Sequence, residues 1–474
     1  MSRNRKVLVI GAGMAGLGAA YTLRKHELDV TVFEASPHPG GRIFGEEVEG
    51  FHIDIGSNIF METYGTVRQV AEELGVSLKR TPVPINGGVY YNGKFHGFYG
   101  GNGLRNQWET AKTILSFQLL SPKGVWQALR CMRMLNARSH DLSFDDHSRL
   151  LDLDMEKSAA EFFESNFGTE FLEWLVGPNL SCYTFAHPEQ IGVAYAMAIL
   201  WHFSLNGAAW PIRPGGKGRG EFMDALVQSC DESIRISTPV RRIVLEDGRA
   251  RGVITEAGFV QADAVICATT ATTALKIAPA LPSGISDVLR RVTYSKCCRV
   301  FFGVDSSPFP PDWYAVTFPR QTGALMVGMS NSAVLAPESV PQGKALIDAL
   351  VIDKQAEELL PLNDEQVGAR VLAEIRKYVP AMSKEPRFIR VYRWDEAVCL
   401  APGRMMTALA QMRRQSLNHV KGLFLAGEYM GVPSTNGALR SGIDTAVDCA
   451  AFVTHQPDRP FWRSDKPLDK ASPW

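Results

Sequence analysis

One glycine-rich segment constrains the fold of this chain more than any other feature. In Lys6–Lys25, KVLVIGAGMAGLGAAYTLRK, a short apolar run leads into Gly11, Gly13 and Gly16, which have G-x-G-x-x-G spacing. The first glycine permits a tight turn, the second lets the backbone approach a pyrophosphate, and the third lets a helix pack closely on the strand. Free N–H groups at the start of that helix favour an anion. The segment therefore predicts a Rossmann-type strand, turn and helix that bind a dinucleotide.

A second apolar strand ends in an acidic residue at the spacing that this interpretation requires. The run DVTVFEAS reaches Glu34, 18 residues after the third glycine, where a carboxylate accepts hydrogen bonds from a ribose diol. Helices of this kind usually close on glycine, but Glu27 stands there, so we expect a turn of different construction. The pair Gly41-Arg42 follows, and the fork of an arginine suits pyrophosphate oxygens better than a lysine would. This arrangement favours FAD over NAD.

A similar turn recurs far along the chain. The segment Leu423–Ala446, LFLAGEYMGVPSTNGALRSGIDTA, contains an apolar run that ends in Gly427-Glu428 and a helix expected to begin near Asn436. Negative charge is stabilised at such a helix start. Because FAD is a long molecule, we expect the two turns to bind the same cofactor at different points along its length.

Composition excludes several classes of protein. Lys+Arg and Asp+Glu number 50 each, so the net charge does not favour nucleic acid as a partner. The eight cysteines show no C-x-x-C spacing, and we expect neither a disulfide framework nor a metal site. No segment has the roughly 18 apolar residues of a spanning helix, and the glycine-rich start does not resemble a signal peptide. We expect a cytoplasmic protein and leave peripheral membrane contact open.

Four motifs resemble those of the superfamily of flavin amine oxidases and protoporphyrinogen oxidases, with phytoene-desaturase-like enzymes as relatives. They are GAGMAG…FEA…GGR, DIGS, WPIRPGGKGRGEFMDAL and LFLAGEYMGVPSTNGALRSG, and the resemblance extends from Val7 to about Ala450. It implies an α/β fold in which a discontinuous Rossmann-type FAD-binding domain of the glutathione-reductase-like type adjoins a mixed helical and sheet substrate domain. Neither Cys nor His stands at the family's attachment position, so we expect FAD to bind non-covalently.

The resemblance also implies a cofactor contact for each motif. Glu34 would bind the adenosine ribose, the backbone of Val240 would meet adenine, and Glu428 would meet the ribityl chain or phosphate. Gly56 and Ser57 of the DIGS motif, with Asn58 directly after them, would lie beside the isoalloxazine ring, and the start of the second helix would face its N1–C2=O edge. The expected cofactor-binding residues are Gly11, Gly13, Ala15, Gly16, Glu34, Gly41, Arg42, Gly56, Ser57, Asn58, Val240, Gly427, Glu428, Thr435, Asn436, Gly437 and Ala438.

Five segments are expected to alternate between the two domains. The FAD-binding domain would take residues 1–83, 210–285 and 415–455. The substrate domain would take 84–209, which includes a helical insertion, and 286–414, and no function is assigned to the tail 456–474.

Residues 104–138 form that insertion and combine apolar and basic side chains. Six basic residues face one acidic residue, Glu109, and the helical pattern breaks at Ser121–Gly124. Such helices suit a surface that touches anionic lipid or admits an apolar substrate. The alternative is a pair of ordinary core helices with a solvated basic face.

Two residues are candidates for contact with the reacting part of the flavin. Amine oxidases place a lysine near the position of Lys296, but four residues before paired aromatics, whereas Lys296 precedes Phe301 by five. A slip of one residue on a strand turns a side chain to the opposite face, so an exposed structural lysine is the alternative. Trp394 resembles an aromatic residue that packs near the flavin, and ordinary core packing is its alternative.

The second turn lacks one residue that amine oxidases use. They set a tyrosine three residues before the Gly-Ala of this helix as a wall that aligns the amine, and Ser434 stands there instead. Loss of that wall removes cation–π guidance of an amine and favours an apolar substrate. Aromatic residues that could line a hydrophobic pocket, or pack in the core, are Tyr183, Phe185, Trp201, Phe203 and Trp210.

Three activities remain open. The first is an FAD-dependent oxidase or dehydrogenase that removes a hydride from a C–H bond of a hydrophobic small molecule and forms a double bond. O₂ or another acceptor would then take the electrons. The second is an amine oxidase that gives an imine, and the third is a non-redox flavin-dependent isomerase or mutase. A flavin-bound scaffold without turnover is also open, and the sequence does not give the oligomeric state.

Overall fold

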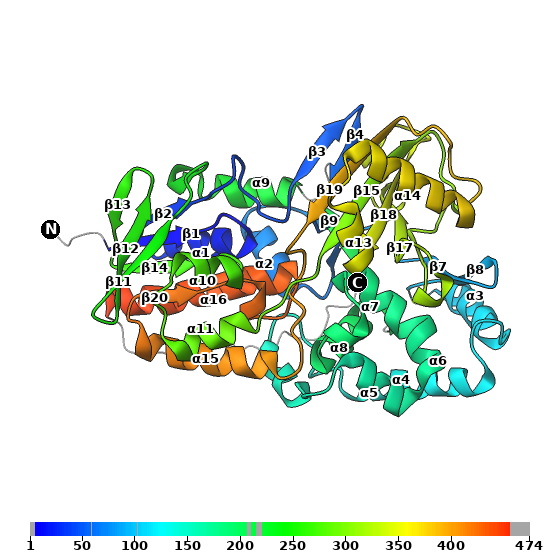
Figure 1. The fold of residues 1–474 in the computed structure, drawn as a ribbon, viewed down its shortest axis with the longest axis horizontal. Coiled ribbons are helices and arrows are strands. Elements are labelled where there is room, and N and C mark those ends of the chain that lie inside the picture. The colour runs from blue at the N-terminus through cyan, green and yellow to red at the C-terminus, as the bar shows by residue number, and fades with distance from the viewer. Residues whose placement is uncertain (1–4, 58, 102, 206–209, 215–219, 456–474) are drawn as a thin grey trace.

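Two sheets at opposite ends of an elongated molecule organise the chain (Figure 1). The computed structural model describes residues 5–57, 59–101, 103–205, 210–214 and 220–455. One sheet contains the first strand of the chain and the other contains most of the strands after residue 296. Helices from the middle of the chain pack below the second sheet in Figure 1.

The first sheet is parallel and has five strands in the order β10-β2-β1-β14-β20. Its strands come from three distant parts of the sequence, and most residues of its three central strands are apolar. Val7–Ile10 pair with Ala264–Cys267 on one side and with Val30–Phe33 on the other. The strands are β1 (Lys6–Ile10), β2 (Asp29–Phe33), β10 (Ile234–Arg235), β14 (Ala264–Cys267) and β20 (Leu423–Leu425).

Helices from both ends of the chain cover one face of this sheet. Helix α1 (Met14–Lys25) lies against α16 (Thr435–Thr454), and α2 (Gly65–Glu73) and α9 (Gly220–Gln228) complete the layer. The contact is close because two glycines occupy it. A Cβ on Gly442 would lie 1.9 Å from the carbonyl oxygen of Ala15, and one on Gly18 would lie 2.7 Å from the Leu439 side chain.

The opposite face of the five-stranded sheet packs on a second core. That core contains Leu8 and Ile10 of β1 together with a small antiparallel sheet and three helices. The elements are β11 (Arg242–Glu246), β12 (Arg249–Thr255), β13 (Gly258–Gln261), α10 (Ala271–Ile277), α11 (Ser283–Arg290) and α15 (Met405–His419). The parallel sheet therefore lies between two layers, which confirms the predicted α/β fold.

The second sheet has seven strands in the order β19-β15-β18-β17-β16-β7-β8 and is antiparallel except between β16 and β7. Helices α13 (Asp353–Leu359) and α14 (Asp364–Tyr378) pack on one face. The strands are β7 (Gly87–Tyr91), β8 (Lys94–Phe98), β15 (Cys297–Val304), β16 (Ala315–Thr317), β17 (Gly328–Asn331), β18 (Ala345–Ile352) and β19 (Phe388–Trp394).

Six α-helices lie between β8 and β9 (Pro211–Pro214) in the described part of the chain. They are α3 (Leu104–Leu115), α4 (Pro122–Ala137), α5 (Ala159–Phe167), α6 (Thr169–Phe171), α7 (Gly177–Thr184) and α8 (Val193–Ile199), and a π-helical turn continues α8 to Leu205. The break between the two helices of 104–138 was expected at Ser121–Gly124, but it lies earlier, between the end of α3 at Leu115 and the start of α4 at Pro122. The Ser121 side chain caps α4 by accepting from the Gly124 N–H at 3.1 Å.

Short elements connect these layers. They are β3 (Gly45–Val48), β4 (Phe51–Asp54), β5 (Phe60–Met61), β6 (Leu78–Arg80), β9 (Pro211–Pro214) and α12 (Ser332–Leu335). In the part of the chain that the structure describes, no helix is both long enough and apolar enough to cross a bilayer. The predicted domain boundaries stay a prediction.

The turn between α1 and β2 was expected to have a different construction because it lacks glycine, but it has the usual left-handed closure of a helix. Glu27 takes the place of glycine: it has φ +55°, and its N–H donates to the Arg24 carbonyl at 3.0 Å. Such a conformation is uncommon for a residue with a Cβ, and here the helix ends without glycine.

Candidate active site

A large cavity extends from the turn after β1 to the second sheet. It encloses about 820 Å³ and is lined by elements of both sheets and by α7. The predicted residues that line it are Gly11, Gly13, Ala15, Glu34, Gly41, Arg42, Gly56, Ser57, Val240, Trp394, Gly427, Glu428, Thr435 and Ala438. Both glycine turns therefore open into one space, although about 400 residues separate them.

The first turn has the geometry of an anion site. Gly11 adopts φ +96° and donates its N–H to the Phe33 carbonyl at 2.7 Å, which fixes the turn against β2. A Cβ on Gly16 would lie 1.8 Å from the Gly11 carbonyl oxygen, so this glycine serves packing and does not line the cavity. A Cβ on Gly13 would find its nearest neighbour only at 3.8 Å, the Gly41 Cα. The second glycine thus faces open space at the positive end of α1.

Glu34 stands at the end of β2, beside that turn. Its carboxylate accepts from the Ala12 N–H at 2.7 Å and from the Ser36 N–H at 2.8 Å. The side chain therefore holds the glycine turn and lines the cavity at the same time.

Arg42 and Glu428 join the two turns directly. The Arg42 Nη1 lies 2.5 Å from Glu428 Oε1 and also donates to the Ala397 carbonyl at 2.8 Å. Glu428 accepts from the Cys399 N–H at 3.2 Å and is buried. From the sequence, each of the two residues was expected to contact the cofactor separately. In the structure they pair with each other, and the charge of Arg42 neutralises the buried Glu428 carboxylate.

The start of α16 differs from the prediction in its available N–H groups. Ser434 caps the helix: its Oγ accepts from the Gly437 N–H at 2.9 Å, and its carbonyl accepts from the Ala438 N–H at 2.9 Å. In the first turn of α16, the backbone N–H groups of Thr435 and Asn436 donate to no described residue. Ser434, which replaces the tyrosine of amine oxidases, is therefore a helix cap. Serine is a preferred N-cap residue, so its position just before the expected helix could have suggested this role.

Asn436 has a structural side chain. It is fully buried and does not line the cavity; its Oδ1 accepts from the Val67 N–H at 3.0 Å and its Nδ2 donates to Asp145 at 2.8 Å. It ties α16 to α2 and to the loop before residue 147. Asn58, which was expected beside the flavin ring, lies outside the described residues.

Lys296 does not reach the cavity. It pairs with Glu357 at the surface, with 2.9 Å between Nζ and the carboxylate, and its side chain is 44% exposed. Residues 297, 299 and 301 share the opposite orientation on β15, and Arg299 of this set lines the cavity. The candidate catalytic role of Lys296 is thus corrected to the surface role that the one-residue slip allowed.

Arg299 was not identified from the sequence. It is buried on β15, and its guanidinium pairs with buried Asp348, at 2.5 Å between Nη2 and Oδ2. Its Nη1 donates to the carbonyls of Ile55, at 2.8 Å, and Gly56. Arg299 therefore positions the segment that brings Gly56 and Ser57 to the cavity. The alternation of side chains along β15 could have identified Arg299, because it places this residue on the same face of the strand as the apolar Phe301.

The part of the cavity near the second sheet is mainly apolar. Tyr183, Phe185 and Phe203 line it, whereas Trp201 and Trp210 do not. The Tyr183 and Tyr64 hydroxyls lie 2.9 Å apart, and burial raises the pKa of both phenols, so both stay neutral. The residues from this part are Ile59, Tyr64, Ile85, Asn179, Cys182, Tyr183, Phe185, Phe203, Tyr314, Ala315, Val316, Thr317, Met329, Ser330 and Leu350.

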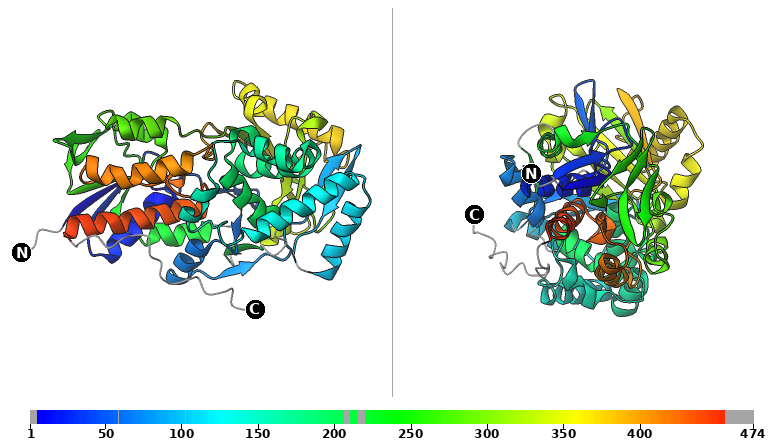
Figure 2. Two further views of the ribbon diagram at one scale, coloured as in Figure 1. Left: turned by 90° about the horizontal axis from the view of Figure 1, so that it is seen from below. Right: turned by 90° about the vertical axis from the view of Figure 1, so that its left-hand side faces the viewer.

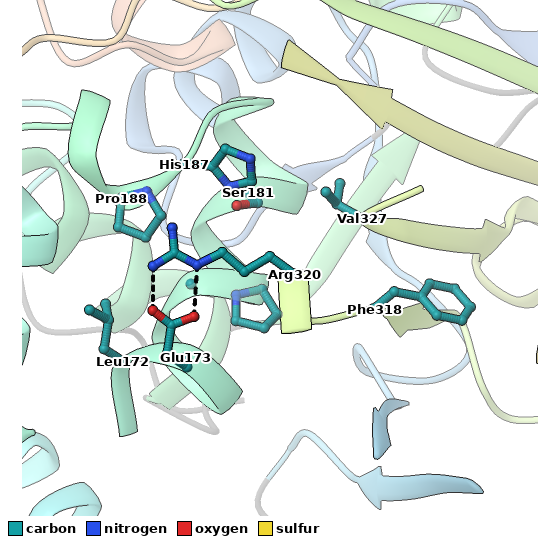
Figure 3. Close-up of a pocket in the computed structure, with 10 residues that line it drawn as sticks. Leu172, Glu173, Ser181, His187, Pro188, Phe318, Arg320 and Val327 are labelled. Atoms are coloured by element: carbon teal, nitrogen blue, oxygen red, sulfur yellow. Dashed lines mark hydrogen bonds and ion pairs between the residues drawn. The ribbon is translucent and has the colours of Figure 1, made fainter. Parts of the chain in front are cut away.

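A second hollow, shown in Figure 3, is not a binding site. Arg320 pairs with Glu173 across it, and about 20 Å³ remains, which is room for one water. His187 lies here, away from the cavity. His202 is buried, its Nε2–H donates to the Leu142 carbonyl at 2.6 Å, and it does not line the cavity either.

Comparison with known proteins agrees with this geometry. A model of the family of flavin-containing amine oxidoreductases matches residues 14–450. A mitochondrial protoporphyrinogen oxidase of Nicotiana tabacum is 22% identical, over 94% of each chain. A coproporphyrinogen III oxidase of Bacillus subtilis is 23% identical, over 94% of this chain and 99% of its own.

Solved structures share the fold. Cyclohexylamine oxidase from Brevibacterium oxydans superposes with a TM-score of 0.72 at 18% identity, over 94% of this chain and 99% of its own. Reduced UDP-galactopyranose mutase superposes with a TM-score of 0.69 at 16% identity, over 95% of this chain and 96% of its own.

These matches define an FAD-dependent oxidoreductase. Within that class, the chain belongs to the family of flavin-containing amine oxidoreductases, which the match over most of its length shows. The residues present fit the cofactor, because an open glycine turn at a helix start and a second helix start face one cavity. When bound there, FAD supplies the capacity to accept a hydride, and the protein supplies position and charge.

Proposed function

We propose that this protein removes a hydride from a C–H bond of a hydrophobic small molecule and leaves a double bond in the product. One observation carries the proposal: the cavity wall from α7, the turn after α8, β16 and β17 combines aromatic and aliphatic side chains with a few neutral polar ones and contributes no carboxylate among the described residues. A substrate bound against that wall is selected by burial of its apolar surface, at roughly 25 cal/mol per Å².

Acidic residues line the cavity only elsewhere in the described chain. They are Glu34, Asp395, Glu396 and Glu428. Glu428 is paired with Arg42, Glu396 accepts from the Thr272 hydroxyl, and Glu34 holds the first turn. An ammonium group beside Tyr183 would therefore meet no carboxylate, which disfavours a simple amine as substrate.

The cofactor contacts are part of the same proposal. Glu34 would bind the adenosine ribose, and the N–H groups that begin α1, with Arg42, would hold the pyrophosphate. Val240 would contact adenine, Gly56 and Ser57 would lie beside the ring, and the N–H group of Thr435, at the start of α16, would face its N1–C2=O edge. Binding would be non-covalent.

An anaerobic reduction experiment tests the activity. Purified yellow protein is mixed without oxygen with candidate amines and with apolar dihydro-compounds, while absorbance near about 450 nm is followed and product mass is measured. We expect apolar compounds to bleach the flavin and to lose two hydrogens. Bleaching by amines alone would reject the proposal in favour of an amine oxidase. An unchanged product mass would favour an isomerase or mutase.

A matched pair of variants locates the substrate. Phe203 lines the cavity, and Trp201, two residues earlier on the same turn, does not. Phe203→Ala is expected to raise KM about tenfold through lost apolar contact, with flavin content unchanged, and Trp201→Ala to leave KM unchanged. Equal effects of both substitutions would place the substrate elsewhere.

A further inference from the structure

Helices α3 and α4 carry an unusual share of exposed apolar side chains. Six of the eight large hydrophobic residues that are exposed in the described chain lie on them or on their connection: Leu104, Trp108, Leu115, Phe117, Trp126 and Leu129, from 47% to 85% exposed. Helix α3 has no buried residue, so it is not the core helix that the alternative interpretation required. We call this set, with the basic residues below, the α3–α4 surface.

The same helix faces are basic. Arg105, Lys123 and Arg133 are exposed and have no ion-pair or hydrogen-bond partner among the described residues. On α4, Trp126, Leu129 and Arg133 follow one another at helical spacing, and the Arg130 guanidinium lies 4.7 Å from the Trp126 ring centroid. Glu109, the single acidic residue between 104 and 138, pairs with Lys112. Apolar and cationic side chains therefore share one solvent-facing surface.

We propose that the α3–α4 surface lies on an anionic lipid membrane. An interfacial helix combines tryptophan and leucine, which enter the headgroup boundary, with lysine and arginine, which bind anionic headgroups. The core of a protein–protein interface is depleted of charged residues as a whole, although arginine is enriched there, whereas here six cations against one acidic residue are interspersed with the apolar residues. Charge complementarity thus identifies lipid as the occupant.

The position of this surface agrees with the proposal. Figures 1 and 2 show α3 and α4 at the end of the molecule opposite the first sheet. Helix α3 packs beside β8, where the Thr110 hydroxyl accepts from the Tyr99 N–H at 2.8 Å. Strand β8 pairs with β7 and β7 with β16, whose residues Ala315–Thr317 line the cavity. Only two strand pairings therefore separate the membrane surface from the wall proposed to bind an apolar substrate.

Sedimentation with vesicles tests the proposal on the full-length flavoprotein. We compare vesicles of phosphatidylcholine alone with vesicles that also contain phosphatidylglycerol, at low and high salt. The charge variant is Arg105→Glu/Lys123→Glu/Arg133→Glu, and its matched control is Arg242→Glu/Lys276→Glu/Lys384→Glu, which reverses three exposed cations elsewhere. The apolar variant is Trp108→Ala/Trp126→Ala, and its control is Phe259→Ala, at an exposed aromatic on β13.

The proposal predicts binding to the anionic vesicles that weakens in high salt. The charge variant is expected to weaken it about 100-fold or more and the apolar variant about tenfold or more, while both controls bind like the original protein. Retained flavin absorbance and circular dichroism show that each variant is folded. Absence of binding, or equal losses in variants and controls, would overturn the proposal. A dimer that the apolar variant dissociates would overturn it in favour of a second copy as occupant.

Discussion

At the scale of single residues, buried charge does more positioning than the sequence suggests. Arg299 and Asp348 are both almost fully buried, and the guanidinium also binds the carbonyls of Ile55 and Gly56. A buried ion pair contributes little net stability, but removing one partner leaves the other charge uncompensated. This asymmetry makes the role of Arg299 measurable.

Arg299→Ala is expected to lower the free energy of unfolding by about 3–5 kcal/mol, because Asp348 then remains buried alone. The double substitution Arg299→Met/Asp348→Leu removes both charges and is expected to cost less than the single one. Both variants should bind FAD more weakly, because the Gly56 carbonyl loses its donor. Chemical denaturation measures the first effect and flavin titration the second. Additive losses in the double variant would contradict the expected coupling.

His202 predicts a pH dependence of stability. Burial lowers the pKa of His202 from its ordinary value of 6.5 to about 4. Between these values the unfolded chain binds the proton and the folded chain does not, so stability is complete above pH 6.5 and falls toward pH 4. The loss from this histidine is up to about 3 kcal/mol.

Denaturant unfolding at several pH values checks this expectation. His202→Gln keeps a donor for the Leu142 carbonyl and cannot take up the proton, so its stability should fall less steeply below pH 6.5. His140→Gln, at an exposed position, serves as the control and should retain the original slope. Identical slopes in all three proteins would exclude His202 as the source.

At the scale of elements, the contact between α1 and α16 decides whether both turns face one cavity. A Cβ at Gly442 would lie 1.9 Å from the Ala15 carbonyl oxygen, which is backbone and cannot move aside alone. Because each helix begins at one of the two turns, a change in their spacing moves the pyrophosphate site relative to the ring site.

Gly442→Ala is therefore expected to destabilise the fold by about 3 kcal/mol or more and to reduce retained flavin. Gly284→Ala is the control: Gly284 lies in α11, where a Cβ would meet no atom within 4 Å, and its replacement should stabilise by up to about 1 kcal/mol. Thermal unfolding and flavin content after desalting measure both. Tolerance of alanine at 442 would show that the helices can separate without loss of the site.

Local patterns predicted the elements near the first turn, and long-range contacts explain what they missed. The β1–α1–β2 unit follows from adjacent apolar runs and glycines, so the sequence was sufficient for it. The pairing of Arg42 with Glu428 spans 386 residues, and no pattern along the chain encodes it. The orientation of the Lys296 side chain depends on the register of β15. Alternation along the strand puts Arg299 on the face opposite to Lys296, but only the structure shows which of the two faces lines the cavity.

At the scale of the whole molecule, the cavity makes FAD a structural component. Its lining comes from both sheets, so a ligand that binds only the folded protein stabilises all of it. At free FAD 100 times its Kd, the gain is about 2.7 kcal/mol. FMN lacks the AMP half and should give a smaller gain, because it cannot contact Glu34.

Thermal unfolding with added FAD or FMN tests this prediction, and acid precipitation tests non-covalent binding. All flavin is expected in the supernatant after precipitation. Glu34→Ala should lose most of the difference between FAD and FMN. Yellow pellets, or equal stabilisation by both flavins, would contradict the assigned contacts.

The order of strands in the first sheet also has a consequence for synthesis in the cell. Strand β20 and helix α16 complete a sheet whose β1 leaves the ribosome hundreds of residues earlier. Domains generally fold as units, so the nascent amino-terminal strands must wait, with apolar faces open to chaperones, until the last tenth of the chain emerges. A premature stop before Leu423 should consequently yield an aggregating product that never acquires colour, however much coenzyme is available.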